Sequence, residues 1–248
     1  MASPSLPEPP HAPSAPSEKV KVKTTWPIIP PSADRTPIRT ERLLLRPLTA
    51  ADVEEVYGLR NQPEVMIWTM AGVVDKNVDE SRVSLDRFLP PKDLVTYHCA
   101  IVYLGDASEN EDTKGVIIGT GGAHKVRPEL GWPEAGYMFR KEYWSKGLAT
   151  EFMRAFTKAW WALPRSEVEL EVDAASVKEK AKNNNDGGVV EVPEILMAKV
   201  SMTNTGSWRV LEKVGFKEYT RWTEPDSRAG YEGEDVELGA FSLEAPES

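Results

Sequence analysis

The sequence predicts a mixed α/β (α+β) fold, and three observations support this expectation. Runs typical of strands and runs typical of helices alternate along most of the chain. Residues 147–163 place apolar side chains on one stripe at helical spacing, with charged side chains opposite and Pro164 directly after them. A strand-like run at 135–139 leads into this helix, so a strand–turn–helix unit lies near the middle of the chain.

The other elements follow from local patterns. The run 42–46 is a predicted strand that stops at Pro47, and Thr49 is the expected cap of a helix just after it. In chain order, the rest are a helix at 79–88, strands at 97–104, 115–120, 167–172 and 195–200, a helix at 205–214, and strands at 216–222 and 235–243. Gly215 suits the left-handed end of the helix before it.

The N-terminal region is expected to be disordered. Half of the twenty prolines lie before Arg39, mixed with Ser, Ala and a few Lys. Such a segment buries too little apolar surface to offset the entropy lost on ordering. We therefore expect a disordered Pro-rich tail at 1–38, a folded domain at 39–243 with an insertion at about 166–194, and a short C-terminal tail at 244–248.

Composition narrows the class of function. The 248 residues are 40% hydrophobic and 28% charged, which is typical of a globular domain, and the net charge is −9. This acidic balance argues against binding to nucleic acid or to anionic lipid, and it favours cationic amines as ligands. One cysteine and three histidines without ligand spacing make a metal site unexpected, and no run resembles a membrane span or signal peptide, so we expect a cytoplasmic enzyme.

The turn before the central helix is a candidate anion site. The first amides of a helix have no internal partner, and the helix dipole adds about half a positive charge there. Gly147 has no Cβ to block the backbone, and Arg140, Lys141 and Lys146 surround it in an otherwise acidic chain. This pattern fits a polyphosphate site, and it also fits an ordinary helix start with solvated cations.

Other phosphate-binding motifs do not match. The residues around Lys146 lack the Walker spacing, so a Walker-type ATPase is unsupported. The glycine-rich run 119–122 is not followed by an amphipathic helix, as a dinucleotide fingerprint requires. We interpret those glycines as a bulge or a close backbone approach within a strand.

Three motifs, one of which consists of two neighbouring runs, resemble those of the GNAT superfamily of acetyltransferases and follow the same order along the chain. EAGYMF at 134–139 and YWSKGLATE at 143–151 are similar to its acetyl-CoA-binding motif, and the nearest branch is that of the RimJ and RimL ribosomal-protein acetyltransferases. The run 197–216 is similar to the second signature of that branch, and TERLLLRP at 40–47 resembles its first strand. The resemblance covers roughly 40–243. Two features depart from the family pattern. One is Trp144, where the wider superfamily often has Gln or Arg, and the other is the insertion at 166–194.

The resemblance implies a fold, a cosubstrate and a set of residues. The fold would be a mixed, mostly antiparallel sheet of about seven strands, flanked by helices, with the fourth and fifth strands splayed apart around the pantetheine arm of acetyl-CoA. The implied cofactor-binding residues are Met138 and Phe139 through their backbone, Ser145, Lys146, Gly147, Leu148, Ala149 and Thr150 through their amides, and Asn204. Ser207 would lie near the thioester sulfur.

The implied reaction is N-acetylation of a primary amine, a protein N-terminus or a small molecule, by direct attack in a ternary complex. Ser207 is the candidate proton donor to the leaving thiol, although Asn204 and Ser207 also have the spacing of a capped helix start. Glu134 is the candidate base, directly or through water, unless it is a surface carboxylate. Glu224 and Asp226 are further candidates.

Two other functions stay open at this point. A domain that kept the fold but lost activity could bind CoA or a partner protein. A nucleotide-binding enzyme could use the same turn at Gly147. The presence of Gly147, Asn204 and Ser207 together favours an active acetyltransferase. The acceptor amine, the role of the insertion and the oligomeric state are not predicted.

Overall fold

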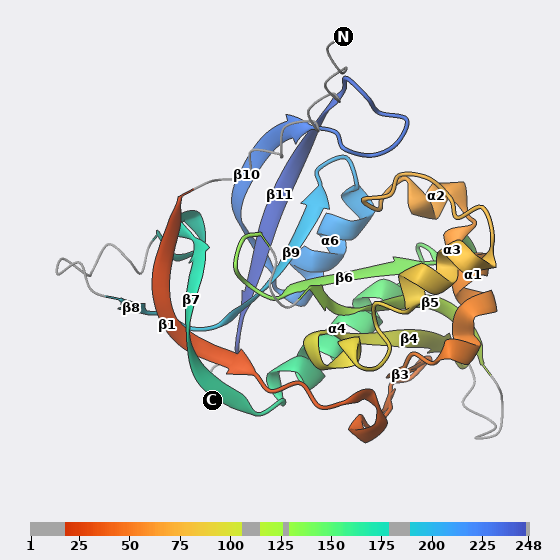
Figure 1. Cartoon of the computed structure of the whole chain (residues 1–248), viewed down its shortest axis with the longest axis horizontal. Coiled ribbons are helices and arrows are strands. Elements are labelled where there is room, and N and C mark those ends of the chain that lie inside the picture. Colours follow the sequence, from red (N-terminus) through yellow and green to blue (C-terminus); the bar gives the residue numbers. More distant parts are fainter. Residues whose placement is uncertain (1–17, 106–114, 126–128, 179–188, 247–248) are drawn as a thin grey trace, which may run out of the picture.

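Two sheets organise the molecule. The computed structural model describes residues 18–105, 115–125, 129–178 and 189–246. An eight-stranded sheet has the order β10-β11-β9-β6-β5-β4-β3-β2, and a three-stranded sheet has the order β7-β1-β8 (Figure 1). We call the first the main sheet and the second the accessory sheet. The main sheet contains all the predicted strands except 167–172.

Most neighbouring strands of the main sheet are antiparallel. Its strands are β2 (Ile38–Arg39), β3 (Leu43–Pro47), β4 (Tyr97–Tyr103), β5 (Val116–Lys125), β6 (Glu134–Phe139), β9 (Ile195–Ser201), β10 (Lys217–Pro225) and β11 (Asp235–Glu244). Only β6 and β9 run parallel, and their register consists of one pair, Glu134 opposite Met197. The mixed, mostly antiparallel sheet with flanking helices confirms the predicted fold class.

Helices cover both faces of the main sheet (Figure 1). On one face lie α4 (Leu148–Trp161) and α6 (Thr205–Val214), and on the other α1 (Val53–Arg60), α2 (Pro63–Met66) and α3 (Val78–Leu85). Short 3-10 turns are η1 (Ser32–Asp34), η2 (Ala50–Asp52), η3 (Lys92–Val95), η4 (Lys141–Tyr143) and η5 (Ala174–Val177). No helix in the described ranges has the length and apolar character needed to cross a membrane.

The apolar faces predicted for the helices pack against the main sheet. The stripe of α4 buries Phe152, Phe156 and Trp160 against strands β3 to β6, and none of these side chains is more than 1% exposed. On the other face, Val53 and Val56 of α1 pack on β4 and β5. Thr49 and Asp52 form the capping box before α1, and Gly215 ends α6 at φ 102°, in the left-handed region that glycine favours.

The accessory sheet corrects the prediction of a disordered tail at 1–38. Strand β1 (Lys19–Pro27) pairs antiparallel with β7 (Arg165–Asp173) over nine residues and parallel with the two-residue β8 (Val190–Glu191). Residues 1–17 lie outside the described ranges. The run KVKVKTTW alternates polar and apolar residues at the period of a strand, and the proline-rich composition around it masked this signal.

The insertion supplies the partners of β1. Both β7 and β8 belong to the predicted insertion at 166–194, and together with β1 they pack on a second cluster at the back of β9 and β11. Trp132 lies in this cluster without solvent exposure, and its indole N–H donates to Ser176 Oγ at 2.8 Å. The described part of the insertion therefore forms a packed layer.

Candidate active site

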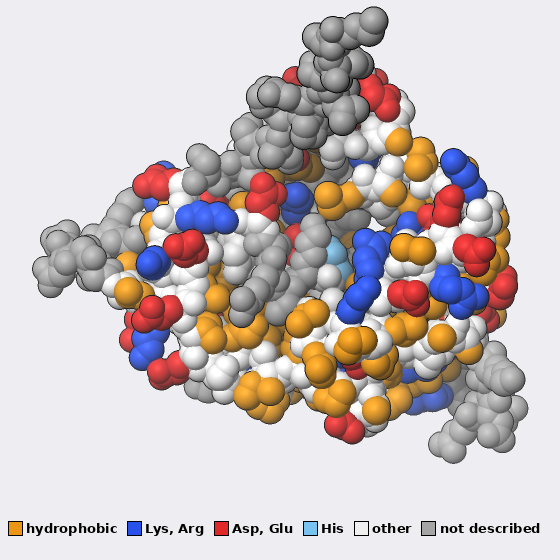
Figure 2. All heavy atoms as spheres, in the orientation of Figure 1, with side chains coloured by type: hydrophobic (Ala, Val, Ile, Leu, Met, Phe, Trp, Pro, Cys, Tyr) orange, Lys and Arg blue, Asp and Glu red, His pale blue; other side chains and the backbone are white. Residues whose placement is uncertain are grey.

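A cavity opens where β6 and β9 separate. The Met197 amide donates to the Pro133 carbonyl at 2.8 Å, and beyond this point the two strands diverge without further pairing. A cavity of about 620 Å³ begins there and extends under α1, α3 and the loop after α2. Figure 2 shows the hollow near the centre of the face, with a histidine on its floor, basic side chains along one side, and acidic and basic side chains together on the other. No described residue of β1, β7 or β8 lines it.

The turn before α4 has the backbone of an anion site. Gly147 is the N-cap of α4 at φ 77°, and Ser145 also has a positive φ, of 60°. Within the described residues, no amide from 145 to 150 donates to a side chain or to a carbonyl outside the helix. A Cβ at Gly147 would meet only Arg42 Nη2, at 3.7 Å, so the backbone conformation is what requires glycine here.

The cations beside this turn differ from those predicted. Arg140 donates to the Glu55 carbonyl at 3.1 Å, and Lys141 forms an ion pair with Glu64, so both are engaged with the α1–α2 side. Lys146 lies 5.1 Å from the ring centre of Tyr143. Arg42, which sequence reasoning did not select as a site residue, donates through Nη1 to the Lys146 carbonyl at 3.1 Å.

Glu151 holds Arg42 in place. Its carboxylate accepts from Thr40 Oγ1 at 2.6 Å and from Arg42 Nε at 2.8 Å. Burial acts to raise the pKa of Glu151, but these hydrogen bonds outweigh it and the pKa lies below its ordinary value. The pair joins β3 to the first turn of α4, so the TERLLLRP run positions the turn as well as forming a strand.

Trp144 connects the turn to the end of β6. Its indole N–H donates to the Phe139 carbonyl at 2.7 Å. This bond engages one of the backbone groups that the family resemblance assigns to pantetheine. Met138 lines the cavity, while Phe139 is buried in the core beside α4.

Asn204 and Ser207 lie together at the start of α6. Asn204 is the N-cap, and its Oδ1 accepts from the Ser207 amide at 3.1 Å, so the alternative of a capped helix start is confirmed. Both residues also line the cavity. Near them, burial raises the pKa of Tyr137 to about 12, and the Ser207 side chain counters part of that shift. The Tyr137 hydroxyl is buried and has no hydrogen bond that meets normal geometry among the described residues.

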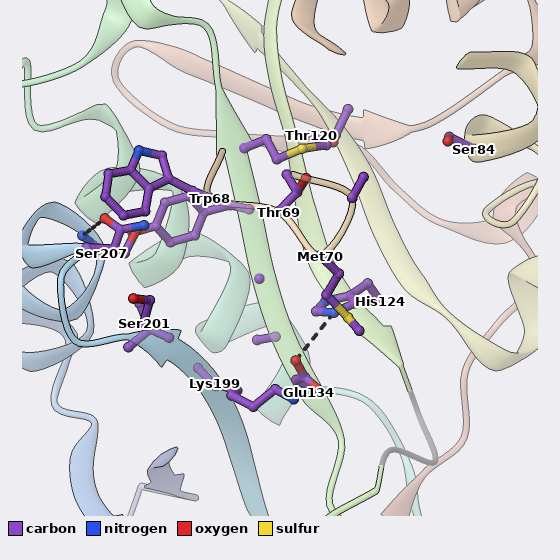
Figure 3. A pocket seen from close by; sticks show the side chains of 18 of the residues that line it. Trp68, Thr69, Met70, Ser84, Thr120, His124, Glu134, Lys199, Ser201 and Ser207 are labelled. Carbon is purple, nitrogen blue, oxygen red and sulfur yellow. Dashed lines mark hydrogen bonds and ion pairs between the residues drawn. The ribbon is translucent and has the colours of Figure 1, made fainter. Parts of the chain in front are cut away.

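Glu134 and His124 form a pair deeper in the cavity. His124 Nε2 lies 3.5 Å from Glu134 Oε1, and the Glu134 side chain is 9% exposed, so it is not a surface carboxylate. Figure 3 shows the two side chains pointing toward each other beside Met70, with Ser207 and Trp68 on another side of the cavity. Sequence reasoning named Glu134 but not its pairing with His124, because strands β5 and β6 bring the two residues together only in the fold.

The other two carboxylates named from the sequence have partners of their own. Glu224 accepts from the Trp222 indole N–H at 2.6 Å. Asp226 binds Arg228, which also donates to the Ile67 carbonyl at 2.5 Å and so joins the loop after α2 to the β10–β11 connection. Both carboxylates line the cavity.

The glycine-rich run 119–122 lies in β5, as predicted. A Cβ at Gly119 would come within 2.2 Å of the Met138 carbonyl, and one at Gly121 within 2.5 Å of the Phe152 ring. These approaches allow β5 to pack closely on β6 and on α4. Of the residues in this run, Thr120 is the one that lines the cavity.

Comparison with known proteins agrees with this geometry. Residues 42–217 match the family described as acetyltransferase (GNAT) domain, which is more than half of the chain. The chain belongs to the GNAT acetyltransferase family. A search of curated protein sequences finds no match.

Solved GNAT structures share the fold at low sequence identity. An acetyltransferase of the GNAT family from Bacillus anthracis is 19% identical, with a TM-score of 0.56, and the match covers 86% of this chain and 100% of that one. Spermidine N-acetyltransferase from Vibrio cholerae, in complex with CoA and spermine, is 14% identical, with a TM-score of 0.53 and coverage of 83% and 97%. The microcin C7 self-immunity acetyltransferase, in complex with acetyl-CoA and AMP, is 14% identical, with a TM-score of 0.54 and coverage of 83% and 93%. Membership of the family supports acetyl-CoA as the cosubstrate.

Proposed function

We propose that this GNAT protein transfers the acetyl group of acetyl-CoA to a primary amine by direct attack in a ternary complex. The observation that carries the proposal is one cavity with a buried carboxylate–histidine pair, Glu134 and His124, and a hydroxyl-bearing helix start at Ser207. The cavity lies at the separation of β6 and β9, and residues 144–150 of the turn are not among those that line it. Such an arrangement can remove a proton from the amine and return one to the leaving thiolate.

The residues present fit acetyl-CoA. The amides at 145–150 and the start of α4 would hold the pyrophosphate, because they are unpartnered donors at the positive end of a helix dipole. Arg42 would add positive charge beside them. Met138 would offer backbone groups to the pantetheine arm, and Asn204 its side-chain amide N–H₂, since its Oδ1 is used in capping α6.

Glu134 would act as the base that the acceptor amine needs. An α-amino group, with a pKa near 8, is substantially neutral at pH 7.5, whereas an alkylamine near 10.4 requires about 4 kcal/mol to lose its proton at pH 7.5. Glu134 can accept this proton directly or through a water, with His124 next to it to share the charge.

Ser207 and Tyr137 would supply the proton to sulfur. A free thiol has a pKa of about 8.5, so donation to the leaving thiolate helps without being indispensable. The Tyr137 hydroxyl, with its pKa raised by burial, stays protonated at neutral pH and lies near the Ser207 side chain. Ser207 would pass a proton to sulfur and recover one from Tyr137.

Mass spectrometry of amines incubated with acetyl-CoA tests the proposal. Peptides, polyamines and arylamines should include at least one class that gains an acetyl group, with release of CoA. Glu134→Gln should lower kcat by about 100-fold and change the pH profile, because the base is lost while the shape is kept. Tight binding of CoA without any product would indicate a silent domain, and displacement of CoA by ATP at comparable affinity would indicate a nucleotide-binding enzyme.

Ser207→Ala separates chemistry from binding. Turnover should fall by about tenfold while the Kd for acetyl-CoA stays within about twofold, because the helix cap uses the Ser207 amide and not its hydroxyl. Equal losses of turnover and affinity would make Ser207 a binding residue only. The RimJ/RimL-like branch and a cytoplasmic location are also part of the proposal, supported by the sequence motifs and the single cysteine.

A further inference from the structure

Charge is distributed unevenly along the cavity. The strands below it follow the order β10, β11, β9, β6, β5, β4. On the side of β10 to β6 the lining is mixed in charge, with Glu224, Glu134 and Lys199 together with the Asp226–Arg228 pair. On the side of β4, Arg60 at the end of α1 and Arg87 just after α3 line the cavity. No carboxylate is among the described lining residues on that side, which we call the basic side.

On the basic side, Arg60 and Arg87 carry two positive charges, and Asp75 supplies one negative charge beside them. Arg60 binds Asp75 through two hydrogen bonds, of 2.6 and 2.9 Å, and Ser81 donates to the same carboxylate at 2.6 Å. Within the described residues, Arg87 has no ion pair, and its Nε donates only to the Ser84 carbonyl, at 3.3 Å. Arg87 is an exposed residue at the rim of the cavity; its partial burial lowers its pKa, and the nearby Arg60 guanidinium lowers it further. Two guanidiniums thus share one carboxylate.

His98 provides a second, independent indication of a ligand on this side. It lies on β4, lines the cavity and is only 7% exposed, yet neither ring nitrogen has a hydrogen-bond partner among the described residues. Its ring stacks on Phe88 at 3.9 Å, which fixes its plane. Burial holds the pKa of His98 well below its ordinary value, and His124, Arg87 and Arg35 act in the same direction. A neutral ring has one N–H to donate, and leaving this donor buried without a partner is unfavourable.

We propose that the acceptor carries a carboxylate about 10 Å from its reacting amine, and that Arg87 and His98 bind this carboxylate. The distance follows from the sheet, because β4 lies two strands from β6 and neighbouring strands are about 4.8 Å apart. The amine position rests on the proposed role of Glu134. The acceptor class is then an amine with a remote acid, such as a short peptide with an acidic side chain or a long ω-amino acid.

This class excludes two simpler acceptors as preferred substrates. A polyamine would place a second cation against Arg87, where positive charge is already in excess. A free α-amino acid has its amine and carboxylate on the same carbon, so it cannot reach Glu134 and Arg87 together. Arg87 is suited to a carboxylate because its two Nη groups present parallel N–H donors.

Calorimetry on the CoA-loaded protein tests the inference without depending on turnover. The probes are 8-aminooctanoic acid, its primary amide, 1,8-diaminooctane and the shorter 4-aminobutanoic acid. The eight-carbon acid should bind about tenfold more tightly than its amide, because charge-assisted hydrogen bonds are lost in the amide. It should also bind more tightly than the diamine and the shorter acid.

Arg87→Gln should reduce the difference between acid and amide to less than about twofold. Arg82→Gln is the matched control, because Arg82 is exposed on α3 and does not line the cavity, and it should keep the difference. Equal binding of acid and amide, or tighter binding of the diamine, would overturn the inference while leaving acetyl transfer itself possible. Selective binding of the acid without acetylation of any amine would retain the inference and contradict the proposed function.

Discussion

The main and accessory sheets use backbone pairing differently. In the accessory sheet, β1 pairs with β7 over nine residues and with β8 on its other edge. In the main sheet, β6 and β9 share a single pair and then separate, and the amides at 145–150 and the ring nitrogens of His98 are left without protein partners among the described residues. Unpaired polar groups are costly unless a ligand binds them. Among the described residues the accessory sheet also has unpartnered buried atoms, Thr24 Oγ1 and Asp173 Oδ2, so the two regions differ in the continuity of their backbone pairing and not in whether unpaired groups occur.

The buried acids of the two regions also differ. Around the main sheet, Asp52 and Asp75 are desolvated, which acts to raise the pKa, but bonds from Arg46 and Arg60 leave both values below the ordinary one. In the accessory region, burial of Asp173 and Glu194 outweighs their hydrogen bonds, and both pKa values are raised. The accessory region therefore contains carboxylates that destabilise the fold when they ionise.

The largest expected effect concerns the joint between the two sheets. Trp132→Ala should lower the free energy of unfolding by about 3–5 kcal/mol, because it removes a fully buried indole and leaves a cavity. CoA affinity should change by less than about threefold, since the six residues of β6 place the turn roughly 20 Å away. Urea denaturation and calorimetry measure the two quantities.

Trp132→Phe is the control for that variant. It keeps an aromatic ring and loses the bond to Ser176, so its cost should be nearer to 1 kcal/mol. A loss below about 1 kcal/mol for Trp132→Ala would show that the accessory layer contributes little to stability.

The second-largest expected effect is a loss of acetyl-CoA affinity at the turn before α4, with little change in the stability of the fold. Gly147→Glu should weaken acetyl-CoA binding by about 100-fold, because a carboxylate beside the amides at 145–150 repels phosphate and a side chain strains φ 77°. Gly230→Glu is the matched control: Gly230 has φ 88° with open space around it, and it lies outside the turn. Unchanged affinity in a folded Gly147→Glu protein would place the anion site elsewhere.

The smallest expected effect is on how stability depends on pH, and it should differ between a buried acid of the accessory region, Asp173, and one of the main sheet, Asp52. The raised pKa of Asp173 means that stability is lost as the pH rises from the ordinary value of 3.8 through the folded value. Asp173→Asn should therefore be modestly more stable than the parent at pH 7 and equal to it near pH 3.5. Its amide oxygen can still accept from the Ala175 amide.

Asp52→Asn should behave in the opposite way. The lowered pKa of Asp52 contributes stability above 3.8 that is lost as the pH falls, so this variant should be less stable than the parent at pH 7. The two difference curves, measured by urea denaturation from pH 3.5 to 7, should have opposite signs. Curves of the same sign would contradict the contrast between the regions.

Much of the main sheet could be predicted because its elements carry local signals. The stripe of α4, the capping box at Thr49 and the left-handed Gly215 are each visible over a few residues. The four-residue α2 and the two-residue β2 are too short for any period to show. Strand β1 was missed because its alternation extends over only eight residues within a proline-rich region.

The candidate site was predictable only in part. Gly147, Asn204 and Ser207 lie in contiguous motifs, so the sequence indicates them directly. The pairing of His124 with Glu134 depends on the register of β5 against β6, and the position of Arg87 beside His98 depends on how α3 packs on β4. These contacts join residues that are distant in sequence and have no local pattern. The assigned roles of all these residues stay predictions.

The pairing of β1 with β7 has a consequence for biosynthesis. About 140 residues separate the end of β1 at Pro27 from the start of β7 at Arg165. At a synthesis rate of about 5–20 residues per second, roughly 7–28 s pass before the partner strand of β1 begins to be made. A waiting strand is open to pairing with other nascent chains, and lysines along a strand oppose such pairing. Every second residue at the start of β1 is a lysine, at Lys19, Lys21 and Lys23. These charges can oppose pairing of β1 with other chains until β7 has been made.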